Sequence, residues 1–301
     1  MPVASIIIAF VIPALAALVF VIVADRPWQR GRADRSRGIS AETDVPRGSW
    51  GGAWATAIAF AIGYWIIERQ VFILPDSNLH WLPHAVLLAA VLGQIACLLP
   101  ARVRGGWIVR GVFGALLAGT AALVLRSPGA FDAMWTALLA GSVLVFWITV
   151  DWSAWRCSGA SLPLVAVPAA VGASLVVMWS GEEQLARATG NVAGATAAAL
   201  LIAWWPGRTH SLATMTGMPA ALTVALVGPL YMAKAYTYND IPWLSYLGPI
   251  AAVPAGMWLG EIPWVRRHSA WFAALVRLVG ACVVTAAGVY LAWRVTDTSI
   301  Y

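Results

Sequence analysis

Stretches of about 20 mostly apolar residues recur along the whole length of this 301-residue chain. A helix needs about 20 residues to cross the hydrocarbon core of a membrane, where its backbone polar groups must bond to one another. Ten stretches meet this requirement, with approximate bounds 2–23, 51–68, 83–99, 107–125, 131–150, 162–180, 189–205, 214–232, 242–260 and 270–293. The sequence therefore predicts an all-α, polytopic integral membrane protein with about ten transmembrane helices, organised as a single transmembrane domain over residues 1–301.

The composition favours lipid as the main solvent of this chain. Apolar residues make up 61% of the sequence and charged residues only 11%, whereas soluble domains carry about 25% charged residues. So few charges could not cover the surface of a water-soluble globule. The one long polar connection is the arginine-rich segment 24–50, which we expect to be a cytoplasmic loop. No folded nucleic-acid-binding module accompanies the net charge of +6, so we expect no nucleic-acid partner.

The basic residues predict the orientation of the helices, because loops on the cytoplasmic side of a membrane carry more lysine and arginine than loops on the other side. Five basic residues follow the even-numbered helices, namely Arg69, Arg126, Arg187, Lys234 and Arg294. Twelve follow the odd-numbered helices, namely Arg26, Arg30, Arg32, Arg35, Arg37, Arg47, Arg102, Arg104, Arg156, Arg208, Arg266 and Arg267. We therefore expect both termini to lie outside. The preference for arginine over lysine is typical of a GC-rich bacterial genome and favours a bacterial inner membrane.

Self-comparison indicates an internal duplication, in which residues 51–125 form a first repeat and residues 214–294 a second. Three segment pairs carry the resemblance, at offsets of 162, 163 and 167 residues: 78–82 with 240–244, 99–104 with 262–267, and 109–115 with 276–281. These offsets span six helices, so the two copies would share one orientation and form parallel repeats. The alternative is that tryptophan, proline and arginine recur at membrane boundaries for general physical reasons.

Four polar residues within or at the edge of the apolar windows form a candidate intramembrane polar site, because ionisable and amide groups are costly in lipid and often mark function. Arg110 and Arg277 occupy matching positions in the two repeats, and Glu261 lies on the helix before Arg277 and is able to pair with it. Gln94 is the amide deep in window 83–99 and needs a hydrogen-bond partner. A structural ion pair or a lipid contact is the alternative to a substrate site for the arginines, and an interhelical hydrogen bond is the alternative for Gln94.

Three prolines in the second repeat predict breaks in its helices. Pro229 follows a glycine in window 214–232, while Pro249 and Pro254 lie in window 242–260. Each proline frees a backbone carbonyl, and unwound backbone lines the binding cavities of many transporters. Ordinary packing kinks are the alternative, since membrane helices tolerate proline.

The sequence predicts no cofactor, no metal site and no catalytic residues. Its three cysteines are scattered and its four histidines are not placed to face one another across helices. No phosphate-binding loop, nucleophile elbow, zinc-protease motif or dinucleotide fingerprint is present. The sequence thus favours a non-enzyme, and a lipid-modifying enzyme is a weaker third hypothesis.

Two functional hypotheses follow from these features. The first is a small-molecule or lipid permease, with a cavity between the two repeats. The second is a non-catalytic structural subunit of a larger membrane complex. The expected partners are membrane lipids, together with other membrane subunits or further copies of the chain.

Overall fold

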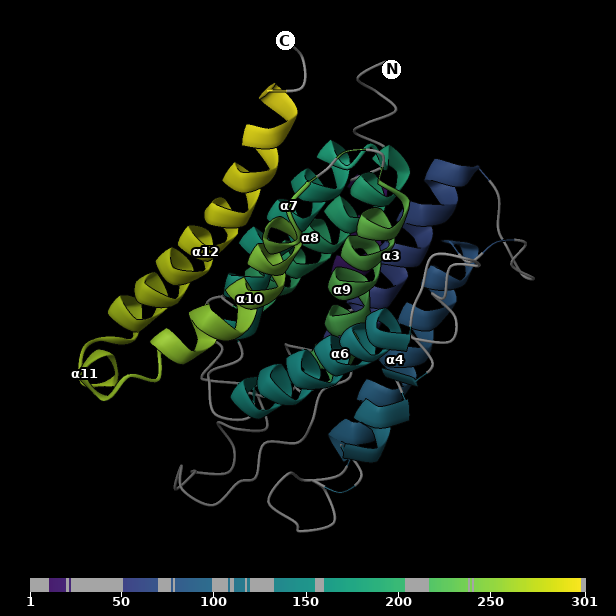
Figure 1. Cartoon of the computed structure of the whole chain (residues 1–301). Helices are drawn as coiled ribbons and strands as arrows, with labels where there is room; N and C mark the ends of the chain where they lie inside the picture. The colour runs from purple at the N-terminus through teal and green to yellow at the C-terminus, as the bar shows by residue number, and fades with distance from the viewer. Residues whose placement is uncertain are drawn as a thin grey trace.

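The computed structural model describes residues 11–19, 22, 51–69, 77, 79–98, 108, 111–116, 118, 119, 133–154, 160–203, 217–237, 239 and 241–298. Within these ranges every regular element is helical (Figure 1). The elements are α3 Gly51–Glu68, the short 3-10 helix η1 Leu79–Trp81, α4 Leu82–Leu98, α6 Ala133–Ala154, α7 Ser161–Trp179, α8 Glu183–Ala203, α9 Met218–Tyr236, α10 Trp243–Leu259, α11 Pro263–Arg266 and α12 Ala270–Thr298.

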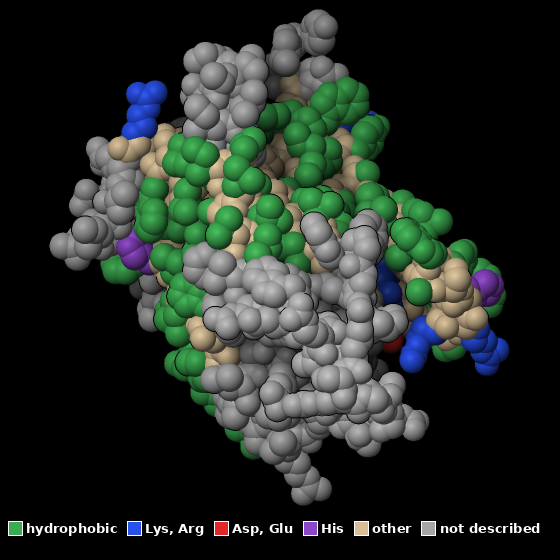
Figure 2. Space-filling view, turned by 180° about the vertical axis from the view of Figure 1, so that it is seen from behind, with side chains coloured by type: hydrophobic (Ala, Val, Ile, Leu, Met, Phe, Trp, Pro, Cys, Tyr) green, Lys and Arg blue, Asp and Glu red, His purple; other side chains and the backbone are tan. Residues whose placement is uncertain are grey.

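Five segments of the described chain are long and apolar enough to cross a membrane, which confirms the helical membrane class. They are Leu79–Ala96, Ser161–Trp179, Glu183–Ile202, Met218–Tyr236 and Ala270–Thr296, and the apolar segment Leu139–Ala154 is shorter. In the view of Figure 2, hydrophobic side chains cover much of the described surface between the helix ends, as expected for a surface in contact with lipid. The loop 24–50 lies outside the described residues, as do most of window 2–23 and much of window 107–125.

Eight of the ten expected windows coincide with α3, α4, α6, α7, α8, α9, α10 and α12. The largest difference in a helix start is at α8, which begins at Glu183 rather than at residue 189. Its first turns are polar, and Glu183 forms an ion pair with Arg187 one turn later, which stabilises a helix beyond its apolar part. Apolarity alone therefore underestimates the length of this helix.

The centre of the bundle is α9, which packs against α3, α4, α6, α7, α8 and α10 (Figure 1). Every residue from Met218 to Ala233 is buried except Tyr231, which is half-buried. The buried polar side chain in this stretch is Thr223, whose hydroxyl donates a hydrogen bond to the Pro219 carbonyl of the same helix at 2.6 Å. The described middle of the protein is thus a packed apolar helix.

The long helix α12 stands at one edge of the bundle and packs against α10 and α7 (Figure 1). Glycines allow α10 and α12 to approach closely: a Cβ on Gly248 would lie 2.7 Å from the Cα of Gly288. Gly256 likewise faces the Arg277 carbonyl and Ala281 of α12. Close backbone approach through small residues is a general way to join helices in lipid, because it increases van der Waals contact.

At Pro229, Pro249 and Pro254, where the sequence suggested breaks or ordinary packing kinks, the described helices are continuous. Pro229 lies inside a continuous α9, and Pro249 and Pro254 lie inside a continuous α10. Each proline removes one helical hydrogen bond, but packing against neighbours keeps the remaining turns helical. For example, the Ser245 carbonyl lacks its usual amide donor, because residue 249 is a proline. Gly288 of α12 packs close to this carbonyl, and a Cβ on the glycine would lie 2.9 Å from the carbonyl oxygen.

The contacts of the two proposed repeats are not symmetric. In the first repeat α3 packs closely along α4, and α4 packs on α9. In the second repeat α9 and α10 share a small contact, and α10 packs mainly on α12 and α7. In the proposed duplication α4 corresponds to α10 and α3 to α9, so a symmetric arrangement would pack α10 on α3 as α4 packs on α9. Among the described helices, α10 and α3 make no comparable contact. Any duplication has therefore been followed by divergence in packing.

Candidate functional site

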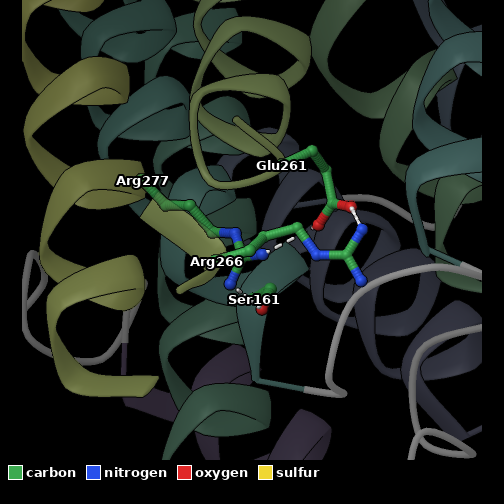
Figure 3. A network of polar contacts seen from close by, with 4 residues as sticks. All are labelled: Ser161, Glu261, Arg266 and Arg277. Atoms are coloured by element: carbon green, nitrogen blue, oxygen red, sulfur yellow. Dashed lines mark hydrogen bonds and ion pairs between the residues drawn. The ribbon is translucent and has the colours of Figure 1, made fainter. Parts of the chain in front are cut away.

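The strongest polar cluster of the described structure joins α7, α12 and the segment after α10 (Figure 3). The Arg277 guanidinium donates through Nη2 to Glu261 Oε1 at 3.0 Å and through Nη1 to Ser161 Oγ at 3.1 Å. Arg266 adds a longer ion pair, with 3.7 Å between its Nη1 and Glu261 Oε2. The contact between Arg277 and Glu261 that the sequence suggested is therefore present.

Local structure brings these side chains together at one end of the bundle. Ser161 is the first residue of α7, Glu261 lies two residues after the end of α10, and Arg277 lies two turns into α12. Gly260, the residue that ends α10, makes room for the arginine, because a Cβ at this position would overlap the Arg277 Nε atom. A larger residue at this position would force the Arg277 side chain to shift away from its present path to Glu261.

Burial makes the pair energetically important. The Arg277 side chain is 10% exposed and that of Glu261 is 21% exposed, whereas Arg266 is 67% exposed. Desolvating a charge costs several kcal/mol unless a partner of opposite charge compensates it. Glu261 provides that compensation and the Ser161 hydroxyl takes a further guanidinium hydrogen. The arrangement can fix α12 to α7 and α10 at this end of the bundle.

Gln94 lies in a separate part of the molecule. Its Oε1 accepts a hydrogen bond of 2.8 Å from the indole Nε1 of Trp54, which joins α4 to α3. Since α4 packs on α3 and α9 while α12 packs on α10 and α7, the structure does not bring Gln94 and Arg277 together. The remaining member of the candidate site, Arg110, lies outside the described residues.

Asn191 is a buried amide that the sequence reasoning missed. It lies on α8, is 1% exposed and faces Gly63 of α3 so closely that a Cβ on the glycine would overlap its side-chain amide. Neither its Nδ2 nor its Oδ1 has a hydrogen-bond partner within the part of the chain that the structure describes. Asn191 is the amide within window 189–205, and the same reasoning that singled out Gln94 could have found it.

A second group of hydrogen bonds closes the opposite end of the bundle, where the α7–α8 turn meets the α9–α10 connection. The Ser180 and Tyr246 hydroxyls lie 2.8 Å apart, and the Thr237 hydroxyl donates to the Ser180 carbonyl at 3.1 Å. The Asn239 amide donates to the Trp179 carbonyl at 2.7 Å. The polar composition of residues 237–240 indicates a loop but gives no pairing, so the sequence could not have predicted these partners.

The turn between α7 and α8 depends on glycine and contains a half-buried acid. Gly181 has a φ of +93°, a conformation that side-chain-bearing residues rarely adopt. Burial raises the pKa of the adjacent Glu182 carboxyl above its usual value, because desolvation disfavours the charged form. Glu182 therefore opposes the folded state at neutral pH to a small extent, and the turn tolerates it.

Within the described ranges, no group of three or more histidine, cysteine, aspartate or glutamate side chains is placed to hold a metal ion. Comparison with protein-family models gives no match for the chain, and no curated protein matches its sequence.

Proposed function

We propose that the chain crosses a bacterial inner membrane ten times, with both termini outside and the loop 24–50 in the cytoplasm. Eight windows coincide with helices, and the described residues of windows 2–23 and 107–125 are helical as well. In this orientation the pair Arg277–Glu261 lies near the cytoplasmic side, and the cluster Ser180–Tyr246 lies near the outer side. The excess of arginine on one side supports this assignment.

We also propose that residues 51–125 and 214–294 derive from one duplicated unit. The first pair of matching segments, 78–82 and 240–244, lies at equivalent places in the two copies. Trp81 immediately precedes α4 and Trp243 begins α10, and both side chains are exposed. The asymmetric packing of the copies means that the duplication is old enough for their contacts to have diverged.

For the molecular role, we propose a non-catalytic subunit of a larger membrane complex, in which this chain is a packed helical scaffold. The observation that carries this proposal is that Arg277 and Gln94 both make side-chain contacts within the chain, with Glu261 and Ser161 in one case and Trp54 in the other. A transport site instead presents such groups to a substrate. Here they join neighbouring helices.

The position of α9 supports the same role. Transporters built from repeats bind substrate near the middle of the membrane, between the repeats. In this chain the element between the α3–α4 pair and the α10–α12 pair is α9, and its buried residues are almost all apolar. An apolar, fully packed helix is suited to mechanical support of its neighbours.

The proposal is tested by extracting the tagged full-length chain from its own host in mild detergent, at native expression level, and measuring its mass by native mass spectrometry. We expect a complex in which one or more other membrane proteins are present in fixed stoichiometry. A chain recovered only as a monomer or homo-oligomer would contradict the subunit role. Parallel extraction of an unrelated membrane protein with the same tag identifies partners that bind the detergent or the tag.

Asn191 favours a permease as the second candidate function. A buried amide without a partner is costly, and polar groups within membrane-spanning helices often mark a functional site. A permease would bind its substrate at this amide, and a panel of small metabolites would then include one that raises the melting temperature of the wild type but not of Asn191→Leu. If no compound distinguishes the two proteins and Asn191→Leu is simply more stable, the amide has no ligand.

A further inference from the structure

Basic and aromatic side chains gather at the corner between α11 and α12. Arg266, Arg267 and His268 are all exposed there, and Trp264 and Trp271 are 60% and 75% exposed. Basic side chains and a histidine project together at one end of the molecule in the space-filling view (right in Figure 2). We define this corner, residues 264–271, as the basic corner.

The charges of the basic corner are not balanced by the acid beside it. Among the described residues, the carboxylate that contacts Arg266 is Glu261: Arg266 lies 3.7 Å from its Oε2, while Arg277 binds its Oε1 at 3.0 Å. One carboxylate thus faces two guanidiniums, and Arg267 adds a third positive charge on the exposed side. Among the residues that the structure describes, an excess of positive charge therefore remains at this surface, where it attracts anionic groups.

The aromatic side chains of the basic corner are packed against one another. The Trp264 ring lies 4.6 Å from the His268 ring and 5.4 Å from the Phe272 ring, measured between centroids. The His268 Nδ1 atom lies 2.8 Å from the Trp264 carbonyl, to which it donates as the Nδ1–H tautomer. Exposed tryptophan beside arginine is typical of the depth at which lipid headgroups meet the acyl chains.

An apolar stripe on α12 continues from the basic corner toward the opposite end of the helix. Trp271, Leu275, Val279 and Val283 are all exposed, and their spacing of four residues places them on one face of the helix. The four residues span about 18 Å at a rise of 1.5 Å per residue, comparable to the hydrocarbon depth of one leaflet. The positive corner and the apolar stripe therefore form one continuous amphipathic surface.

We propose that this surface binds an anionic phospholipid of the adjacent leaflet. Arg266 and Arg267 bind the headgroup phosphate, Trp264 and Trp271 lie at the glycerol level, and an acyl chain runs along the α12 stripe. The charge excess selects anionic over zwitterionic headgroups, and the stripe selects a lipid over a free phosphate, which has no apolar part. The site belongs to the membrane-embedded surface and holds for either molecular role proposed above.

The test is native mass spectrometry of the full-length chain in detergent, titrated with phosphatidylglycerol or with phosphatidylcholine. We expect the wild type to retain phosphatidylglycerol and to bind phosphatidylcholine more weakly. Basic residues near an anionic surface contribute about fivefold in affinity each, so Arg267→Gln is expected to weaken phosphatidylglycerol binding about fivefold and Arg266→Gln/Arg267→Gln about 25-fold. Arg267→Gln leaves both ion pairs of Glu261 intact. If the double variant folds poorly, the single variant therefore still tests the proposal.

The matched control is Arg69→Gln/Arg294→Gln, which removes two exposed positive charges at the far ends of α3 and α12. We expect its phosphatidylglycerol binding to equal that of the wild type. Equal loss in the control and the test variants would show that net charge alone attracts lipid and would overturn the proposal. Equal retention of the two lipids by the wild type would also overturn the proposal, as would displacement of the lipid by glycerol 3-phosphate. A second protein bound to the α12 stripe in place of lipid would overturn it as well.

Discussion

Replacing Glu261 by glutamine should destabilise the protein by about 2–3 kcal/mol. Removing one partner of a fully buried ion pair costs about 3–5 kcal/mol, because the other charge is left uncompensated. In this pair Arg277 is 10% exposed, but Glu261 is 21% exposed, and water reaches the carboxylate from one side. We therefore take a value below the fully buried range. The neutral amide can still accept one hydrogen bond from the guanidinium, but it does not compensate the charge.

The opposite substitution should be much milder. In Arg277→Met the buried charge itself is removed, and Glu261 keeps Arg266 within 3.7 Å. We expect a cost of about 1 kcal/mol or less, because the remaining Glu261 is 21% exposed and still has Arg266 as a partner, so no uncompensated buried charge is left. The double variant Glu261→Gln/Arg277→Met should then be close to Arg277→Met alone. This non-additivity distinguishes an ion pair from two independent packing contacts.

The assay is equilibrium unfolding of the purified variants in mixed micelles, followed by circular dichroism. Glu183→Gln is the matched control, because it makes the same chemical change in an exposed ion pair. Glu183 pairs with Arg187, and the Glu183 side chain is 68% exposed. Exposed pairs contribute about 0–1 kcal/mol, so the control should fall in that range. If Glu261→Gln is no more destabilising than Glu183→Gln, the buried pair does not hold α12 in place.

Three further outcomes are expected. Gly248→Ala should lower the unfolding free energy by about 1–3 kcal/mol, because the new Cβ would lie 2.7 Å from the Gly288 backbone. Gly141→Ala is the control, because a Cβ at this position meets open space, and it should have no such cost. Equal effects of the two substitutions would exclude a close crossing of α10 and α12. Glu182→Gln should raise the melting temperature at pH 8 but not at pH 4. Burial raises the pKa of the Glu182 carboxyl in the folded state, so the wild type has its full stability below the pKa of the unfolded state and loses part of it as the pH rises through the pKa of the folded state. An effect that does not change with pH would contradict this. Gln94→Leu should cost about 1 kcal/mol, as measured by the same unfolding assay, and no loss would show that the Trp54 contact is dispensable.

The helices were predictable from sequence because a membrane imposes a minimum length of apolar chain. The starts of α3, α10 and α12 lie within a residue of the expected windows, where polar or glycine-rich segments bound them. The start of α8 was not predictable in this way, since its first turns are held by Glu183 and Arg187 rather than by lipid. The continuity of α10 through Pro249 and Pro254 was not predictable, because the effect of a proline depends on whether neighbouring helices support the turns around it.

The candidate site was partly predictable for a similar reason. A charge in an apolar window must have a partner, and Glu261 was within reach of Arg277 on the preceding helix, whereas Ser161 lies 116 residues away and has no signal in the sequence. Gln94 was expected to bond across helices, but its donor Trp54 was one of 18 tryptophans. Partners on distant helices follow from the tertiary packing, which a single sequence does not specify.

The most direct test of the account is the accessibility of single cysteines placed at the two ends of the bundle, in a background without Cys97, Cys157 and Cys282. A membrane-impermeant maleimide added to intact cells should label Glu182→Cys, in the α7–α8 turn. The same reagent should label His268→Cys, in the basic corner, only after the cells are opened. Labelling of both positions from the outside, or of His268→Cys alone, would contradict a helical bundle that crosses the membrane with its arginine-rich end in the cytoplasm.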